Sequence, residues 1–460
     1  MGNRTQKTLP NGAYTTYNYS NRNWLTSLQN RKSDATLVSS YAYAHDYVGN
    51  RTSMTEANGD VSSYVYDNVY RLVSEEKRDS GNTLLWRYQY TYDGVGNRLT
   101  MNNSGVVTYT YDANNKLTQL VAPSGTTTFG YDGNGNMTSM VAPGPVTTTY
   151  GYDYENRLTA VTSPSYTAGY TYAADGLRLR AQESNHAYPD RWLQYDGVRP
   201  VLEGTLSGDT FTTLNRYVLE GNSYYDPLIS ASIGGANRFY LYDGLGSTRQ
   251  LLDSSQAVTD TYSYEAFGNS MGSTGSTPNP YKYVGSLGYY QTGSSLRHLG
   301  ARYYMPEVGR FTSRDAILLG RYDYTYAGNN PVVRLDPSGY RFGPAENRNY
   351  SECMAKYAPT SLPDPKGYHE CVSQCRCETL GAGNAPATYW GGLGAGALGL
   401  LVPAAGVVGG WVGLGMGAGV GGYAEYECRR LCKEQYGGNP DQYRIWDQYC
   451  QRHYGPPRFW

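Results

Sequence analysis

Charged residues are scarce in this 460-residue chain, and neither sign of charge predominates. Only 17% of the residues are charged, against about a quarter in ordinary soluble domains. Lys and Arg together number 38, and Asp and Glu 39, which gives a net charge of −1. Because the two signs of charge are so nearly balanced, the chain has no general electrostatic attraction for a polyanion. We therefore expect no nucleic-acid partner.

The N-terminus lacks the apolar segment of a signal peptide, so we expect no signal peptide on this chain. Cysteine is missing from the first 340 residues. All seven cysteines follow residue 340: Cys353, Cys371, Cys375, Cys377, Cys428, Cys432 and Cys450. Composition thus separates a cysteine-free body from a distinct C-terminal region.

Tyrosine and glycine are abundant, with 50 and 56 residues. Together with the many threonines and asparagines they favour strands and tight turns. A helical bundle or a doubly wound α/β enzyme would depend more on Ala, Leu, Glu and Lys. The composition therefore predicts a mainly β protein.

A unit of about 20 residues recurs through residues 1–180. Its clear copies are YDNVYRL, YDGVGNRLT, YDANNKLT, YDGNGNMT and YDYENRLT, which begin at Tyr66, Tyr92, Tyr111, Tyr131 and Tyr152. Weaker copies begin at Tyr19, His45 and Tyr172. Alternating Thr and Tyr before a copy predict a strand with one aromatic face. The Asp-x-x-Gly or Asp-x-x-Asn that follows predicts a turn, so each repeat is expected to be a hairpin in a continuous sheet.

These repeats resemble the YD repeats of the RHS family, which also occur in teneurins and in the C subunits of insecticidal toxin complexes. A second stretch, Arg238 to Gly339, resembles the repeat-associated core of that family through YLYDGLGSTRQLLD, YEAFGN and the run from Tyr281 to Asp315. The resemblance implies antiparallel hairpins wound into a spiral sheet or partial shell. The core would close one end of this shell around a C-terminal effector.

The resemblance also divides the chain. It implies YD repeats in 1–180, connecting β repeats in 181–235, a repeat-associated core in 236–340 that ends in DPSGY, and a variable region in 341–460. We expect the variable region to be small, α-helical, Cys-rich and Gly-rich. The first repeat is incomplete, so we expect the chain to continue the repeats of a longer parent protein.

In family members that cleave themselves, two Asp-Pro-x-Gly-Leu motifs each supply an aspartate to an aspartyl-protease-like site. The matching residues here are Asp315 and Asp336, with Arg314 as the adjacent arginine, and cleavage would follow Tyr340. Two close carboxylates can share one proton, so that one activates water and the other protonates the leaving amine. The sequence departs from the family pattern at Met305, Ala316, Leu318 and Tyr340. The alternative is that Asp336 to Gly339 is only a type I turn and that Asp315 caps a short helix.

Residues 379–424 contain no Asp, Glu, Lys, Arg or His. Glycines at Gly409, Gly413, Gly417 and Gly421 form consecutive Gly-x-x-x-Gly steps, as in closely packed membrane helices, and Pro403 divides the run. We expect a membrane-inserting helical hairpin. A buried hairpin or a flexible linker inside the shell is the alternative.

The cysteines flank this run as two Cys-x-x-x-Cys arms. Residues four apart share a helix face, which favours the disulfides Cys371–Cys432 and Cys375–Cys428, with Cys353 and Cys450 as a third pair and Cys377 free. Zinc binding with His369 or His453 and free thiols are the alternatives. Disulfides would indicate a tail that ends outside the cytosol.

The leading hypothesis is an RHS-type polymorphic toxin, secreted or displayed at the cell surface, in which a β-shell carries a C-terminal effector opposed by a downstream immunity protein. A cell-surface adhesin that stacks its tyrosines on carbohydrate is the second hypothesis, and an inactive truncated fragment is the third. Neither an effector-enzyme motif nor a cofactor or metal fingerprint is recognised in the chain, so no cofactor is expected.

Overall fold

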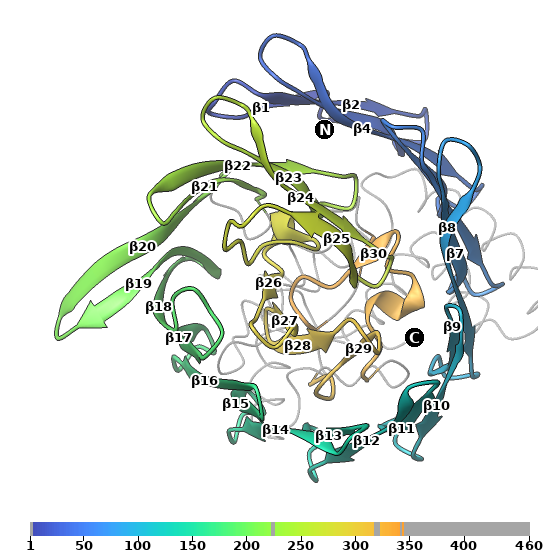
Figure 1. Ribbon diagram of the computed structural model, residues 1–460, viewed down its shortest axis with the longest axis vertical. Helices are drawn as coiled ribbons and strands as arrows, with labels where there is room; N and C mark the ends of the chain where they lie inside the picture. Colours follow the sequence, from blue (N-terminus) through green and yellow to red (C-terminus); the bar gives the residue numbers. More distant parts are fainter. Residues whose placement is uncertain (1–2, 222–225, 317–322, 341–342, 345–460) are drawn as a thin grey trace, which may run out of the picture. The chain divides into compact units, whose positions relative to one another are not determined.

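The computed structural model describes residues 3–221, 226–316, 323–340 and 343–344. These residues belong to one compact unit, Met1–Glu346, and most of them form one sheet of 25 strands (Figure 1). The strands are β1 (Gln6–Thr8), β2 (Tyr14–Tyr19), β3 (Leu25–Arg31), β4 (Leu37–His45), β5 (Arg51–Glu56), β6 (Val61–Tyr66), β7 (Leu72–Arg78), β8 (Leu84–Tyr92), β9 (Arg98–Asn102), β10 (Val106–Tyr111), β11 (Leu117–Ala122), β12 (Gly125–Tyr131), β13 (Met137–Ala142), β14 (Val146–Tyr152), β15 (Leu158–Ser163), β16 (Tyr166–Tyr172), β17 (Arg178–Glu183), β18 (Asp190–Asp196), β19 (Arg199–Ser207), β20 (Thr210–Leu219), β21 (Leu228–Ile233), β22 (Ala236–Tyr242), β23 (Thr248–Leu252), β24 (Val258–Tyr264) and β25 (Ser270–Thr274).

Each strand pairs antiparallel with the next along the chain, so the sheet is a simple meander. The prediction of a mainly β fold built from antiparallel hairpins is confirmed for the described residues. The meander continues past the boundaries drawn at 181 and 236, which stay predictions. Of the region after residue 340, which we expected to be helical, the structure describes only residues 343–344.

The YD tyrosines occupy equivalent sites, as predicted. Each of these tyrosines follows a β-bulge and pairs across its turn with the first residue of the next strand. The five tyrosines are Tyr66, Tyr92, Tyr111, Tyr131 and Tyr152. Several of their hydroxyls also join successive hairpins. The Tyr92 hydroxyl donates to the Leu72 carbonyl at 2.8 Å, and the Tyr111 hydroxyl to the Arg98 carbonyl at 2.8 Å. A tyrosine therefore fixes the register of two repeats at once.

The aspartate of the motif closes the turn that follows it. Asp93 Oδ1 accepts the backbone N–H groups of Val95 at 3.0 Å and Asn97 at 2.8 Å, and its Oδ2 accepts the Asn97 side-chain amide at 2.9 Å. Gly96 has a φ of +93°, a conformation that glycine adopts readily. The Asp-x-x-Gly spacing thus encodes the turn locally.

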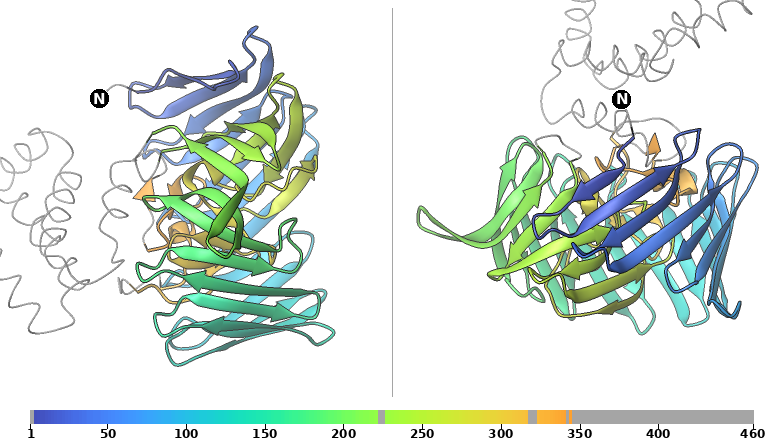
Figure 2. Two further views of the ribbon diagram at one scale, coloured as in Figure 1. Left: turned by 90° about the vertical axis from the view of Figure 1, so that its left-hand side faces the viewer. Right: turned by 90° about the horizontal axis from the view of Figure 1, so that it is seen from above.

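The sheet winds as a spiral, and its later strands pass inside the first ones (Figures 1 and 2). We call the contact between β1–β7 and residues 226–269 the seam. Side chains hold it: the Gly244 N–H donates to the Tyr43 hydroxyl at 2.6 Å, and the Asn30 amide donates to the Tyr242 carbonyl at 3.1 Å. Among the described residues no backbone-to-backbone hydrogen bond crosses the seam.

Residues 276–316 and 323–340, which we call the core segment, lie within the curve of the sheet (Figure 1). Their elements are short: η1 (Gly285–Leu287), β26 (Tyr290–Gln291), β27 (Arg297–Leu299), β28 (Arg302–Met305), β29 (Arg310–Phe311), η2 (Ala327–Asn329) and β30 (Arg334–Leu335), which pairs with β31 (Gly343–Pro344). Strands β26 to β29 form a separate four-stranded sheet.

The core segment is attached to the YD turns of the surrounding sheet. Arg310 donates to the Asn97 side-chain oxygen at 2.9 Å, Asn330 donates to the Asn50 side-chain oxygen at 3.1 Å, and the Tyr324 hydroxyl donates to a turn carbonyl at 2.8 Å. The sheet therefore positions the segment that carries both predicted catalytic aspartates.

Candidate functional site

Two tight turns interlock at the end of the core segment. The Asp336-Pro337-Ser338-Gly339 stretch is a turn in which the Gly339 N–H donates to the Asp336 carbonyl at 3.3 Å. Gly339 has a φ of +70°, and a Cβ there would lie 2.1 Å from the Leu299 carbonyl oxygen. The Ser338 carbonyl accepts the Ala301 N–H at 3.0 Å. The motif glycine is therefore required by this close approach to the β27–β28 hairpin.

Asp315 and Asp336, the two aspartates predicted from the sequence, meet at one guanidinium group. Arg302 Nη2 lies 2.8 Å from Asp315 Oδ2 and 3.2 Å from Asp336 Oδ2. Asp315 follows β29 and Asp336 follows β30, so the chain after two different strands brings the two carboxylates to Arg302 of β28.

Arg302 also binds the backbone on both sides of the site. Its Nε donates to the Gly339 carbonyl, and its Nη1 donates to the Asp323 carbonyl at 3.1 Å. The guanidinium carbon lies 3.6 Å from the centre of the Phe311 ring, so the cation stacks on an aromatic face. One side chain thus ties together the three chain segments that contain Asp315, Asp323 and Asp336.

The site is largely shielded from solvent. Asp336 is 1% exposed and Arg302 is 4% exposed. The Asp336 N–H donates to the Tyr289 hydroxyl at 2.9 Å, and the Ser338 hydroxyl donates to Asp336 Oδ1 at 3.3 Å. Charge interactions are stronger away from water, so the contacts of Arg302 with the two carboxylates are stronger here than they would be at the surface.

Arg314, the arginine that the sequence placed beside Asp315, does not join this group. Its side chain is about half exposed, and its Nε lies 2.9 Å from Asp323 Oδ2. Arg302 is the residue of this site that sequence reasoning missed. It lies in the stretch GARYYM of the family resemblance, but no spacing in one sequence indicates that it faces both aspartates.

Tyr340, the residue before the predicted cleavage point, is half-buried, and its N–H donates to the Ser338 hydroxyl at 3.2 Å. Burial raises the pKa of its phenol, and the negative charge of Asp315 raises it further. The Tyr340 side chain therefore stays neutral close to the aspartates. Arg341 and Leu318 lie outside the described residues, and so does the helix that Asp315 was alternatively expected to cap.

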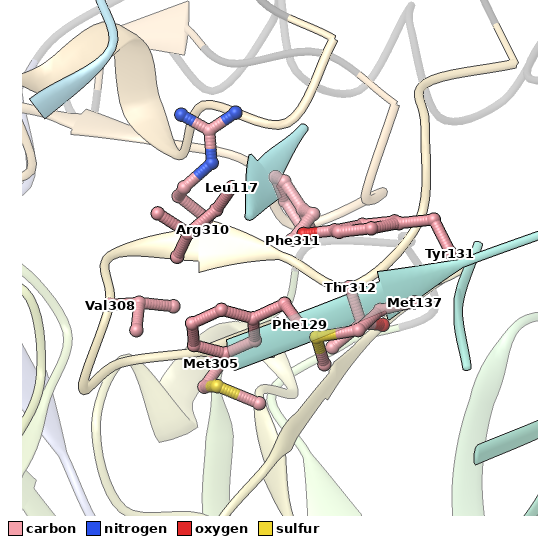
Figure 3. Close-up of a pocket in the computed structure, with 9 residues that line it drawn as sticks. All are labelled: Leu117, Phe129, Tyr131, Met137, Met305, Val308, Arg310, Phe311 and Thr312. Carbon is pink, nitrogen blue, oxygen red and sulfur yellow. The ribbon is translucent and has the colours of Figure 1, made fainter. Parts of the chain in front are cut away.

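Phe311, which stacks on Arg302, also lines a small cavity whose other side chains are mostly apolar (Figure 3). Its volume is about 10 Å³, which is room for about one water molecule. It is lined by Leu117, Phe129, Tyr131, Met137, Met305, Val308, Arg310, Phe311 and Thr312. Met305 is 5% exposed and packs with Phe129 and Met137. The methionine that departs from the family pattern is therefore a packing residue in an apolar setting.

The remaining predicted sites follow residue 340 and lie outside the described residues. They are the cysteines Cys353, Cys371, Cys375, Cys428, Cys432 and Cys450, and the glycines Gly409, Gly413, Gly417 and Gly421. Within the described ranges, no helix has the length and apolar character needed to span a bilayer. The same ranges contain no group of three His, Cys, Asp or Glu side chains suited to a metal ion.

Comparison with known sequences identifies the repeats. The RHS Repeat family model matches residues 92–127, 111–147 and 131–168. The chain is 30% identical over 196 residues to the tRNA3(Ser)-specific nuclease WapA of Bacillus spizizenii, an alignment that covers 37% of this chain and 8% of the relative. It is also 35% identical over 108 residues to Salivary gland surface protein 1 of Aedes aegypti, covering 22% of this chain and 3% of that protein. The matched part is therefore a small fraction of these relatives' length.

Two solved structures show a distant likeness to this chain. The crystal structure of TcdB2-TccC3 without its hypervariable C-terminal region gives a TM-score of 0.39 at 17% identity, covering 71% of this chain and 21% of that one. The Photorhabdus luminescens Tc holotoxin pore gives a TM-score of 0.35 at 17% identity, with coverage of 71% and 21%.

Proposed function

This chain is an RHS-repeat protein, and from that premise we propose that it belongs to an RHS-type toxin in which residues 1–340 are the carrier and residues 341–460 the cargo. The observation that carries the proposal is the meeting of Asp315 and Asp336 at Arg302, in a buried turn directly before the change of composition at residue 341. Curated relatives named as tRNA nucleases support the toxin class.

The proposed reaction of the carrier is hydrolysis of its own Tyr340–Arg341 bond. The pair enters the reaction with one proton. The ionised aspartate removes a proton from water, and the water oxygen bonds to the Tyr340 carbonyl carbon. The protonated aspartate gives its proton to the Arg341 nitrogen as the bond between that carbon and the nitrogen breaks. The products are a carboxyl group on Tyr340 and a free amine on Arg341. Arg302 acts as a positioning residue, because it holds both carboxylates and the Gly339 carbonyl next to Tyr340.

Expression of the intact chain beside Asp315→Asn and Asp336→Asn tests this reaction. We expect the unmodified chain to yield a fragment that begins at Arg341, and each variant to lose it, since either change removes a proton carrier. Asp153→Asn is the matched control, because Asp153 closes a YD turn with Arg157 and should leave cleavage unchanged. Intact mass and N-terminal sequencing of the products give the readout. A chain that stays whole, or variants that cut as fast as the unmodified chain, would contradict the proposal.

The cargo is proposed to act on membranes through its glycine-spaced run around Gly413, and to be stapled by the disulfides predicted above. Leakage of dye-loaded anionic vesicles by the cleaved protein, compared with its Gly413→Leu variant, tests the first point. Mass mapping of the non-reduced protein tests the second, and four free thiols at Cys371, Cys375, Cys428 and Cys432 would refute it. Delivery outside the producing cell and a cognate immunity protein belong to the same proposal.

A further inference from the structure

At the seam, two layers of the described sheet lie against each other without backbone hydrogen bonds between them. Elsewhere each strand exchanges backbone hydrogen bonds with its chain neighbours. At the seam the two layers of the spiral are held by polar side chains, by a small apolar cluster that includes Leu9, Phe239 and Leu252, and by a larger cluster that contains Leu72 and Phe267. Opening the spiral there breaks no strand pairing and separates only side-chain contacts.

A pair of buried glutamates spans the seam. Glu75 of β7 is 1% exposed and Glu265, in the turn after β24, is 3% exposed. The Tyr90 hydroxyl lies 3.1 Å from Glu75 Oε1 and 3.4 Å from Glu265 Oε2, so the two carboxyl groups meet at one hydroxyl. The Ala266 N–H is within 3.1 Å of both Glu75 oxygens. The turn at 265–269 is therefore docked on β7 and β8 through these groups.

Glu265 takes the place of the aspartate in this version of the YD turn. Its Oε2 accepts the Phe267 N–H at 3.0 Å, and its Oε1 accepts the Asn269 N–H at 2.6 Å. These bonds hold the carboxyl group of Glu265 within its own turn, from which it faces Glu75. Two like charges in this position repel each other strongly unless a proton lies between them.

Six other titratable groups lie near the pair on neighbouring elements: Tyr64 and Tyr66 of β6, Tyr88 and Tyr90 of β8, Arg98 of β9 and Tyr304 of β28. Burial raises the pKa of each of these tyrosines, so they stay neutral between pH 4 and 9. The Arg98 guanidinium lies over the rings of Tyr90, at 4.7 Å, and Phe267, at 4.1 Å. Within the described residues Arg98 forms no ion pair with either glutamate.

Burial, followed by the charge of Glu265 and a hydrogen bond with it, holds the pKa of Glu75 well above its ordinary value of 4.5. A carboxyl group with a raised pKa in the docked state keeps a proton that the undocked chain has lost. Its contribution to docking is therefore complete below about pH 4.5 and is lost as the pH rises through the raised pKa.

We propose that the seam is a proton-controlled latch: with one proton on the Glu75–Glu265 pair the turn at 265–269 stays docked on β7 and β8, and removal of that proton releases the turn. The latch concerns the carrier shell alone and is independent of self-cleavage. It makes opening of the spiral sensitive to the acidity of the surroundings.

A neighbouring ion pair has the opposite dependence and limits the opening in alkali. Glu56 Oε1 lies 2.9 Å from Arg249 Nη2 across the seam and 3.2 Å from Lys77 Nζ. Burial acts to raise the pKa of Glu56, but the charges of Arg249 and Lys77 outweigh it and lower the pKa below 4.5. This ion pair is present above pH 4.5 and is lost as the pH falls through the lowered pKa. Rising pH thus releases the 265–269 turn while Glu56 still holds β23.

Hydrogen exchange of the intact chain, followed by mass spectrometry from pH 5 to 9, tests the latch. Protection factors, corrected for the intrinsic pH dependence of exchange, are compared for peptides that contain Ala266 and Phe267 and for peptides from β13 and β14. We expect protection of the 266–267 peptides to fall by up to about tenfold per pH unit, the limit for release of one proton. Protection of the β13–β14 peptides should stay constant.

Glu75→Gln should remove the pH dependence, because a neutral amide needs no shared proton. Glu76→Gln is the matched control on the same strand: Glu76 binds Arg78 and Arg87 instead of Glu265, and its variant should retain the full slope. A flat response in the unmodified chain, or an equal slope in Glu75→Gln and the unmodified chain, would overturn the proposal. The unmodified chain alone decides the question if Glu75→Gln does not fold.

Discussion

The repeat sheet and the core segment use similar side chains over very different distances in the sequence. In the sheet, Tyr92 binds a carbonyl 20 residues away, and Asp93 binds amides within its own turn. In the core segment, Arg310 binds Asn97 across 213 residues, and Tyr304 donates to the Phe267 carbonyl across 37. Interactions in the first region repeat with the sequence motif, whereas those in the second occur once and depend on the whole spiral.

This difference predicts where the protein tolerates change. A substitution that breaks one repeat interaction in the sheet leaves neighbours of the same kind on both sides, so the cost stays local. A substitution in the core segment disrupts groups that are buried and that join several chain segments. The same type of substitution should therefore cost more inside the spiral than along it.

The largest difference in stability loss between the core segment and the sheet is expected when an arginine is replaced. Arg302→Leu leaves the carboxylates of Asp315 and Asp336 without their shared cation, which should cost about 3–5 kcal/mol of unfolding free energy. Arg157→Leu removes an arginine that pairs with Asp153 in a YD turn at a partly exposed site, and should cost about 1 kcal/mol or less. Denaturant unfolding of the two variants, measured at one pH, gives the comparison. Equal losses would show that Arg302 is no more constrained than a turn arginine.

Glycine should give the next largest effect. In Gly339→Ala a methyl group enters at a φ of +70° against the Leu299 carbonyl, and we expect a loss of roughly 2–4 kcal/mol from strain and overlap. Gly133 lies in a YD turn without a positive φ, and a Cβ there meets nothing within 4 Å. Gly133→Ala should therefore be neutral in the same unfolding experiment. A neutral Gly339→Ala would mean that the two interlocked turns can separate freely.

The contrast also explains how much of the molecule the sequence predicts. The hairpins and the equivalent tyrosines follow from the repeat, because each bulge, turn and hydroxyl interaction is encoded within about one repeat length. The joining of Asp315 and Asp336 at one site was available only from the family resemblance. Arg302 was missed because its role depends on three segments that meet in space.

The glutamate pair was missed for a related reason. Glu75 lies in the run SEEKR of β7, where four consecutive charged residues resemble an exposed strand. Strand alternation shows that Glu75 and Glu76 face opposite sides, but it does not show which of the two sides a later turn of the spiral will cover. Burial of Glu75 is decided by the docking of residues 265–269, some 190 positions further along the chain.

The smallest effect concerns single hydroxyl groups within the sheet. Tyr92→Phe removes the bond to the Leu72 carbonyl and leaves that carbonyl to find another donor, so we expect a loss of about 1 kcal/mol. Tyr154 extends from a YD turn and is fully exposed, so Tyr154→Phe should leave stability unchanged. Both variants keep the aromatic ring, which isolates the hydroxyl contribution in thermal or denaturant unfolding. If Tyr92→Phe is as harmless as Tyr154→Phe, sheet packing alone holds the repeats together, and the tyrosine hydroxyl bonds between strands add nothing to their register.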